Sequence, residues 1–242
     1  MDYKNVIKAI EDKSYLISMS TLESLIELGY SLEFNNDTSI LDICCGYGEM
    51  LKIWSEAFGV KGLGVELFDQ HVKDGNERLV SAGISEKVKI VQGDAKKFET
   101  EERFDVVCLS GEDLFNGIVG NIQHCEKYLK PNGVIIIGTP YYKSKEVPKE
   151  LIEFEGDLPT LGELYTLMSD VGYNVLHFCS DTIHEWERYI SWSGKRDIHA
   201  LKKLQDDEKK QKKQEWIDYW YKMYFDYRIK YEGWVVFALA KR

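Results

Sequence analysis

The chain has 242 residues, of which 44% are hydrophobic, so it can bury the core of one elaborated domain. Its net charge of −10 argues against a general nucleic-acid binder, which needs a cationic surface. The first residues are too charged for a secretory signal, and no uncharged apolar run approaches the about 20 residues that span a membrane. We therefore expect a cytoplasmic protein without a membrane or nucleic-acid partner. Nothing in the composition indicates an oligomeric state.

Strand-like and helix-like segments alternate along most of the chain. Residues 1–37 are predicted to form a helical extension, in which Ser20 and Glu23 would make a capping box for a helix ending near Gly29. The predicted strands are "SILDICC", "GLGVEL", "KVKIVQ", "FDVVCLS", "GVIIIGT", "YNVLHFCS" and "EGWVVFALAK", and the predicted helices cover 48–58, 69–82, 117–130 and 160–171. This alternation predicts an α/β fold with a doubly wound, mostly parallel seven-stranded sheet.

Residues 38–180 are expected to form the core of the domain, and residues 231–242 a last strand that returns antiparallel to the others. Between them, residues 181–230 are an insertion rich in Trp, Tyr and Lys, with helical spacing from about residue 198. Because a predicted helix crosses over to the strand before the insertion, that strand should run parallel to the first. The insertion should therefore start at the edge of the sheet where parallel strands end, which is where ligands of such folds bind.

A glycine-rich turn follows the first strand, in "ILDICCGYGEML". Gly46 and Gly48 leave room for a ligand to approach the backbone, but Leu51 stands where a dinucleotide fingerprint has its third glycine, which disfavours NAD. Acids end successive strands at Glu66 and Asp94, and Asp42 precedes the turn. These loops contain three acids and no basic residue. They therefore suit a nucleoside that has a positively charged end and no phosphate.

These residues resemble the motifs of the class I S-adenosylmethionine (SAM)-dependent methyltransferases over about residues 38–180. The family's first motif is an acid, one residue, then G-x-G-x-G, and Cys44 stands here in place of its first glycine. The resemblance implies SAM as the cofactor, with Glu66 at the ribose and Asp94 at the adenine. We expect Cys44 to have ordinary backbone dihedrals and only to narrow the pocket. The implied cofactor-binding residues are Asp42, Cys44, Gly46, Gly48, Glu66, Leu67, Asp94, Ala95 and Ser110.

A small-molecule methyl acceptor is the favoured substrate. The loop after the fourth strand reads Ser-Gly-Glu-Asp from Ser110, and not the Asn/Asp-Pro-Pro-aromatic motif of enzymes that methylate exocyclic amines of bases or of glutamine. Glu112 and His184 are the candidate bases. Because the insertion should roof an acceptor pocket together with residues 12–20, an arginine there would favour an acceptor with a carboxylate or phosphate. The candidate acceptor-binding residues are Tyr141, Tyr142, Trp186, Tyr189 and Arg228.

Other interpretations remain open from the sequence. They are a non-catalytic SAM-binding sensor, an RNA or protein methyltransferase and, more remotely, an aminopropyltransferase. The five cysteines contain no C-x-x-C pair, and the adjacent Cys44 and Cys45 should face opposite sides of an extended chain. No metal site is therefore expected.

Overall fold

The computed structural model describes residues 14–111 and 113–242. A single seven-stranded sheet has the order β3-β2-β1-β4-β5-β7-β6. Its strands are β1 (Ser39–Ile43), β2 (Lys61–Glu66), β3 (Val88–Gln92), β4 (Phe104–Ser110), β5 (Leu129–Tyr142), β6 (Tyr173–Ser180) and β7 (Glu232–Lys241). The helices that precede the insertion are α2 (Leu22–Ser31), α3 (Glu49–Phe58), α4 (Asp69–Ser81), α5 (Gly117–Glu126), α6 (Lys149–Glu155) and α7 (Leu161–Asp170).

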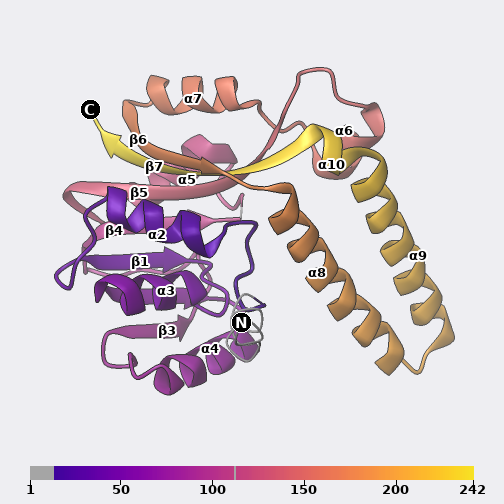
Figure 1. The fold of residues 1–242 in the computed structure, drawn as a ribbon, viewed down its shortest axis with the longest axis horizontal. Helices are drawn as coiled ribbons and strands as arrows, with labels where there is room; N and C mark the ends of the chain where they lie inside the picture. Colours follow the sequence, from indigo (N-terminus) through magenta and orange to yellow (C-terminus); the bar gives the residue numbers. More distant parts are fainter. Residues whose placement is uncertain (1–13, 112) are drawn as a thin grey trace, which may run out of the picture.

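The strand directions confirm the predicted fold. The neighbouring pairs among β1 to β5 are parallel, and β7 is antiparallel to both β5 and β6. The strand β6 therefore runs with β1, and the chain leaves it at the edge where β1, β2 and β4 end (Figure 1). This direction puts the start of the insertion at the same edge of the sheet as the glycine-rich turn, although three strands lie between β6 and β1.

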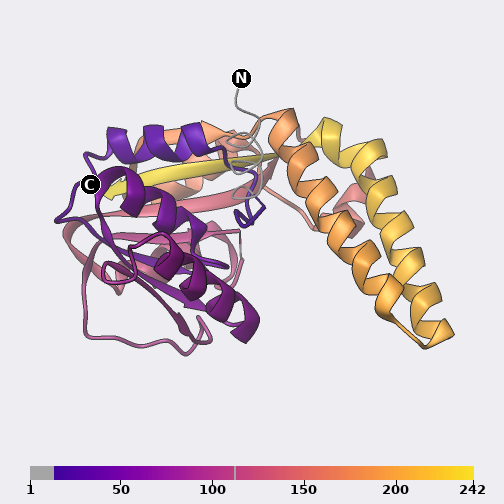
Figure 2. The ribbon, with the colours of Figure 1, turned by 60° about the horizontal axis from the view of Figure 1, so that its bottom comes forward.

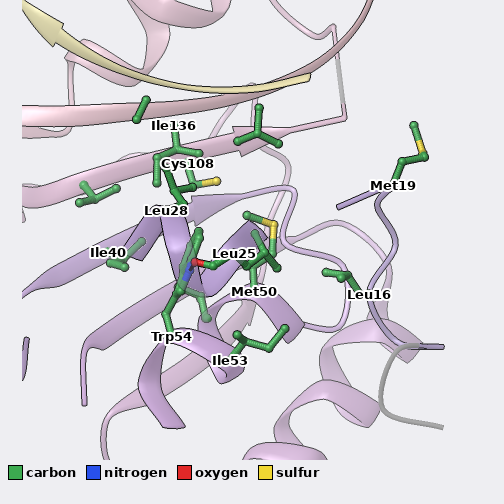
Figure 3. Close-up of a cluster of buried hydrophobic side chains, with 14 of the residues drawn as sticks. Leu16, Met19, Leu25, Leu28, Ile40, Met50, Ile53, Trp54, Cys108 and Ile136 are labelled. Carbon is green, nitrogen blue, oxygen red and sulfur yellow. Dashed lines mark hydrogen bonds between the residues drawn. The ribbon is translucent and has the colours of Figure 1, made fainter. Parts of the chain in front are cut away.

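Two apolar cores lie on opposite faces of the sheet. One includes buried side chains from α2, α3 and α4, and the other includes side chains from α5 and α7. In the first core Trp54 is fully buried, and its indole N–H donates to the carbonyl oxygen of Leu25 over 2.8 Å (Figure 3). This bond ties α2 to α3.

The insertion forms a helical hairpin of α8 (Ile183–Lys203) and α9 (Asp207–Met223), followed by a π-helical turn at Tyr224–Arg228 and α10 (Ile229–Tyr231). The hairpin projects beyond the arrowheads of β1 and β3 (Figures 1 and 2). The first helix begins at residue 183 and not near 198, because the Thr182 hydroxyl accepts from the N–H of Glu185 and caps it.

The N-terminal prediction was wrong in its details. The capping box joins Thr21 and Ser24 instead of Ser20 and Glu23, since the Ser20 hydroxyl is occupied by a hydrogen bond from Ser18. The helix continues past the expected stop to Ser31, and Gly29 within it packs against the ring of Phe58. Residues 14–20, expected to be helical, form turns and bends, and residues 1–13 lie outside the described part.

Two helix boundaries further along the chain also differ. The helix predicted over 117–130 ends at Glu126, because the chain already pairs with β4 from Leu129 onward. The helix α6, at Lys149–Glu155, was not predicted at all. Its last residue, Glu155, lines a cavity at the carboxyl edge of the sheet.

Candidate active site

A cavity of about 570 Å³ lies at the carboxyl edge of the sheet. This volume is in the range of ordinary small-molecule sites. Its walls come from the first turns after β1, β2, β3 and β4, from the segment Tyr15–Met19, and from residues of α6, α8 and β7. Segments that are far apart in sequence therefore line one cavity.

The turn after β1 has a backbone that requires glycine. Gly46 has φ +57° and Gly48 has φ +67°, and a Cβ on Gly48 would lie 2.6 Å from Cδ1 of Ile90. Cys44 also has a positive φ, at +62°, so the expectation of ordinary dihedrals was wrong. In this turn the N–H of Cys45 donates to the carbonyl oxygen of Val65, and the N–H of Gly48 donates to that of Cys45. A side chain in the left-handed conformation costs about 1–2 kcal/mol.

Glu66 is the anchor of the turn. One carboxylate oxygen accepts from the N–H of Gly46 and the other from the N–H of Phe68, each over 2.9 Å. The Nδ1 atom of His71 lies 3.6 Å from the same carboxylate. With its side chain almost fully buried at the cavity wall, Glu66 both shapes the turn and keeps lone pairs for a ligand.

Asp42 lies deeper in the same wall, on β1 opposite Cys108 of β4. Burial raises its pKa to about 7, against the lowering effect of a hydrogen bond with Cys108, and the nearby Glu66 raises it further. A cationic ligand group beside this carboxyl would favour its charged form. Asp42 is therefore suited to face the positive end of a ligand.

The other predicted cofactor residues surround these acids. Asp94 lies after β3, where its carboxylate accepts from the N–H of Lys96 over 3.0 Å. The cavity is lined by Asp42, Cys44, Gly46, Glu66, Leu67, Asp94, Ala95 and Ser110. Gly48 does not line it, because this glycine serves the backbone turn at the start of α3.

The predicted acceptor residues are divided among different places. Tyr189 and Arg228 line the main cavity. Tyr141 and Trp186 line a second cavity of about 90 Å³, and Glu232 borders both. Tyr142 is buried and its hydroxyl donates to the carbonyl of Gly156 over 2.7 Å, so it packs the core instead of walling the site.

The structure describes only one of the two candidate bases. His184 is exposed on α8 and lines neither cavity. Glu112 lies outside the described residues. The carboxylates that do reach the cavity are further candidates for a base, if the acceptor needs one.

Arg228 is not free to bind an acceptor anion. Its guanidinium donates to both carboxylate oxygens of Glu232, over 2.7 and 3.1 Å, and its Nε lies 3.0 Å from Glu155. The guanidinium also lies 5.1 Å from the ring centroid of Trp186. Two carboxylates therefore already neutralise the Arg228 guanidinium. The geometry does not support the expectation that Arg228 binds a carboxylate or phosphate of the acceptor.

Several residues that line the main cavity were not predicted from the sequence. They include Glu155, at the end of a helix that was not predicted, Glu232 and Trp234 in the last strand, and Arg196 on α8. The sequence did not single them out, because only the path of the folded chain brings them to the sheet edge. In residues 14–111 and 113–242, no group of three or more His, Cys, Asp or Glu could hold a metal ion. The same residues include no helix with the length and apolarity needed to cross a bilayer.

Comparisons with known proteins agree with this geometry. A model of the methyltransferase domain family matches residues 40–133. A SAM-dependent methyltransferase of Geobacter sulfurreducens, solved in complex with S-adenosyl-L-homocysteine, is 26% identical and superposes with a TM-score of 0.87 over 93% of both chains. The uncharacterized protein YjhP of Escherichia coli is 28% identical over the whole of both chains, and its X-ray structure superposes with a TM-score of 0.88 over 96% of this chain and 98% of that one.

A more distant relative matches only the core. Demethylmenaquinone methyltransferase of Staphylococcus aureus is 29% identical over 53% of this chain and 54% of its own length. The domain match, the strand order and the full-length structural likeness identify the chain as a class I, Rossmann-like SAM-dependent methyltransferase.

Proposed function

We propose that this protein transfers the methyl group of SAM to a small-molecule acceptor. The observation that carries the proposal is the single cavity in which the acids at the ends of β1, β2 and β3 face a second group of residues from α6, α8 and β7. A cofactor at the first group would point its reacting end toward an acceptor at the second.

The residues at the cofactor end fit SAM by their chemistry. Glu66 has carboxylate lone pairs for ribose hydroxyls, and Asp94 can accept from the exocyclic amine of adenine. Asp42 offers a carboxyl whose charged form a cationic group would favour. The positive-φ turn leaves Gly46 without a side chain at the wall. When bound, SAM would supply an activated methyl group, and the protein would supply alignment.

The lining of the cavity on several sides supports a small acceptor over a polymer. Tyr15–Met19 covers one side, and α8 contributes Tyr189 and Arg196 to another. The net charge of −10 would repel nucleic acid. The named activity of the demethylmenaquinone relative, which acts on a small molecule, points in the same direction.

Calorimetry on the purified protein tests the cofactor, and release of S-adenosylhomocysteine across a panel of small acceptors tests the reaction. We expect SAM and S-adenosylhomocysteine to bind and NAD to give no heat. Binding without turnover on a broad panel would favour a non-catalytic SAM-binding protein. Turnover on RNA or protein, with none on small molecules, would contradict the proposal.

A further inference from the structure

The cavity has a marked excess of acidic groups. Beyond the cofactor end its charged lining residues are Glu155 from α6, Arg196 from α8, and Arg228 and Glu232 from the end of the insertion and β7. Arg196 is exposed and its guanidinium lies 4.8 Å from the ring centroid of Trp192, so it belongs to the rim. Within the buried group, two carboxylates share one guanidinium, which leaves one negative charge uncompensated.

Glu155 carries this uncompensated charge at the cavity. Glu232 is the better partner of Arg228, because it makes two hydrogen bonds and only 1% of its side chain is exposed. Glu155 has only the ion pair at 3.0 Å, and its side chain remains 21% exposed. Among the described residues, none donates a hydrogen bond to its carboxylate. Burial and the charge of Glu232 raise the pKa of Glu155 to about 6, against the lowering effect of Arg228.

The rest of this end of the cavity suits a cation with N–H groups. Tyr189 and Trp234 contribute aromatic side chains, and aromatic faces attract cations. Ser110, at the end of β4, has a buried hydroxyl oxygen without a partner among the described residues, so it can accept a hydrogen bond. A Cβ on Gly138 would contact both the Ser110 oxygen and the Trp234 ring, so these two side chains are neighbours.

Resting on the proposed function, we infer that the acceptor is a primary or secondary aliphatic amine, which binds as its ammonium ion at Glu155. The nitrogen gives one proton to the Glu155 carboxylate, and its freed lone pair forms the new bond to the methyl carbon. The carbon–sulfur bond breaks at the same time, and its electron pair stays on sulfur as the neutral thioether. A carboxylate positioned in this way is a general base, with a typical contribution of about 10²–10⁴ in rate.

The first experiment measures which class of compound binds. We titrate primary and secondary aliphatic amines into the protein saturated with S-adenosylhomocysteine. Each amine is compared with the alcohol and the carboxylic acid of the same carbon skeleton. We expect amines to bind at least ten times more tightly than their partners. The same panel is then offered with SAM, and we expect N-methylated products. A panel in which no amine binds, or in which only alcohols or acids are methylated, would overturn the inference.

The second experiment compares Glu155→Gln with Glu153→Gln, a matched change on an exposed side chain of the same helix. At pH 7 we expect Glu155→Gln to lower kcat for an amine about 100-fold, while the affinity for SAM stays within twofold of the wild type. Its rate should recover as the pH approaches the pKa of the amine itself, because the free base then needs no proton acceptor. Glu153→Gln should behave as the wild type.

These readouts separate the inference from the proposed function. A protein that fails to bind SAM contradicts the proposed function, whatever the panel shows. If the protein binds SAM and methylates only alcohols or acids, the proposed function stands and the inference of an amine acceptor is refuted. Unchanged amine methylation by Glu155→Gln at every pH would also refute the role of Glu155.

Discussion

The carboxylate of Glu66 accepts a hydrogen bond from the backbone N–H of Gly46 over 2.9 Å, across twenty positions of sequence. The bond joins the end of β2 to the turn after β1, so one side chain both holds the turn and lines the cavity. The part of the cavity wall around Glu66 is therefore preformed, and a ligand that binds Glu66 does not have to order it.

We expect Glu66→Ala to weaken SAM binding about 10- to 100-fold, because a hydrogen bond to a charged group contributes about 1.5–3 kcal/mol. Isothermal titration calorimetry measures the change. Glu77→Ala, which removes the same charge from an exposed site on α4, should leave the affinity unchanged. Equal affinities in wild type and Glu66→Ala would remove Glu66 from the ribose role.

Cys44 has φ +62° where a glycine would carry no steric cost. We expect Cys44→Gly to fold and to be as stable as the wild type or more so, by up to about 1 kcal/mol, since relief of the left-handed backbone outweighs the added entropy of the unfolded chain. Cys44→Ala keeps the Cβ and its cost, so it should be less stable than Cys44→Gly. Urea unfolding of the three proteins decides this, and the reverse order of the two variants would contradict it.

The raised pKa of Asp42, about 7 against an ordinary value of 3.8, predicts a pH dependence of stability. The folded state holds this proton more tightly than the unfolded state does. The contribution of Asp42 is therefore complete below pH 3.8, declines as the pH rises toward 7, and is constant above that. The maximal slope is about 1 kcal/mol per pH unit.

The difference in unfolding free energy between wild type and Asp42→Asn isolates this effect. Glu155 and Asp181, whose pKa values burial also raises, titrate in both proteins and cancel. We expect the stability of the wild type to decline relative to the variant between pH 4 and 7. A difference that stays flat over this range would show that Asp42 ionises normally.

Removal of the guanidinium from the Glu155–Arg228–Glu232 group should destabilise the fold. In Arg228→Ala two carboxylates would remain together without a cation, and breaking a buried ion pair costs about 3 kcal/mol or more. Arg196→Ala, at the exposed rim, should change the unfolding free energy by less than about 0.5 kcal/mol. A loss below about 1 kcal/mol for Arg228→Ala would mean that the group is more hydrated than its burial indicates.

The sequence predicted the sheet because its signals are local. The apolar runs of β1 and β4, the glycine-rich turn and the acids at strand ends each lie within a few residues of one another. The direction of β6 followed from the helical crossover that precedes it, and the edge at which the insertion starts followed from that direction. Those inferences needed no knowledge of side-chain contacts.

The acceptor end could not be predicted in the same way. The partners of Arg228 are Glu232, four positions away, and Glu155, on a helix that the sequence did not indicate. Without them Arg228 seemed available for an anion, whereas the folded chain has already neutralised it. The dihedrals of Cys44 were misjudged for a related reason, since the turn imposes a positive φ that a cysteine does not signal.

A crystal structure of the protein grown with S-adenosylhomocysteine would show directly whether this cavity holds the cofactor and in which direction its sulfur points. We predict adenine beside Asp94, ribose hydroxyls on Glu66, and the sulfur facing the end of the cavity formed by Ser110, Trp234 and Glu155. A ligand bound outside this cavity, or one whose sulfur points away from Ser110 and Glu155, would contradict the account.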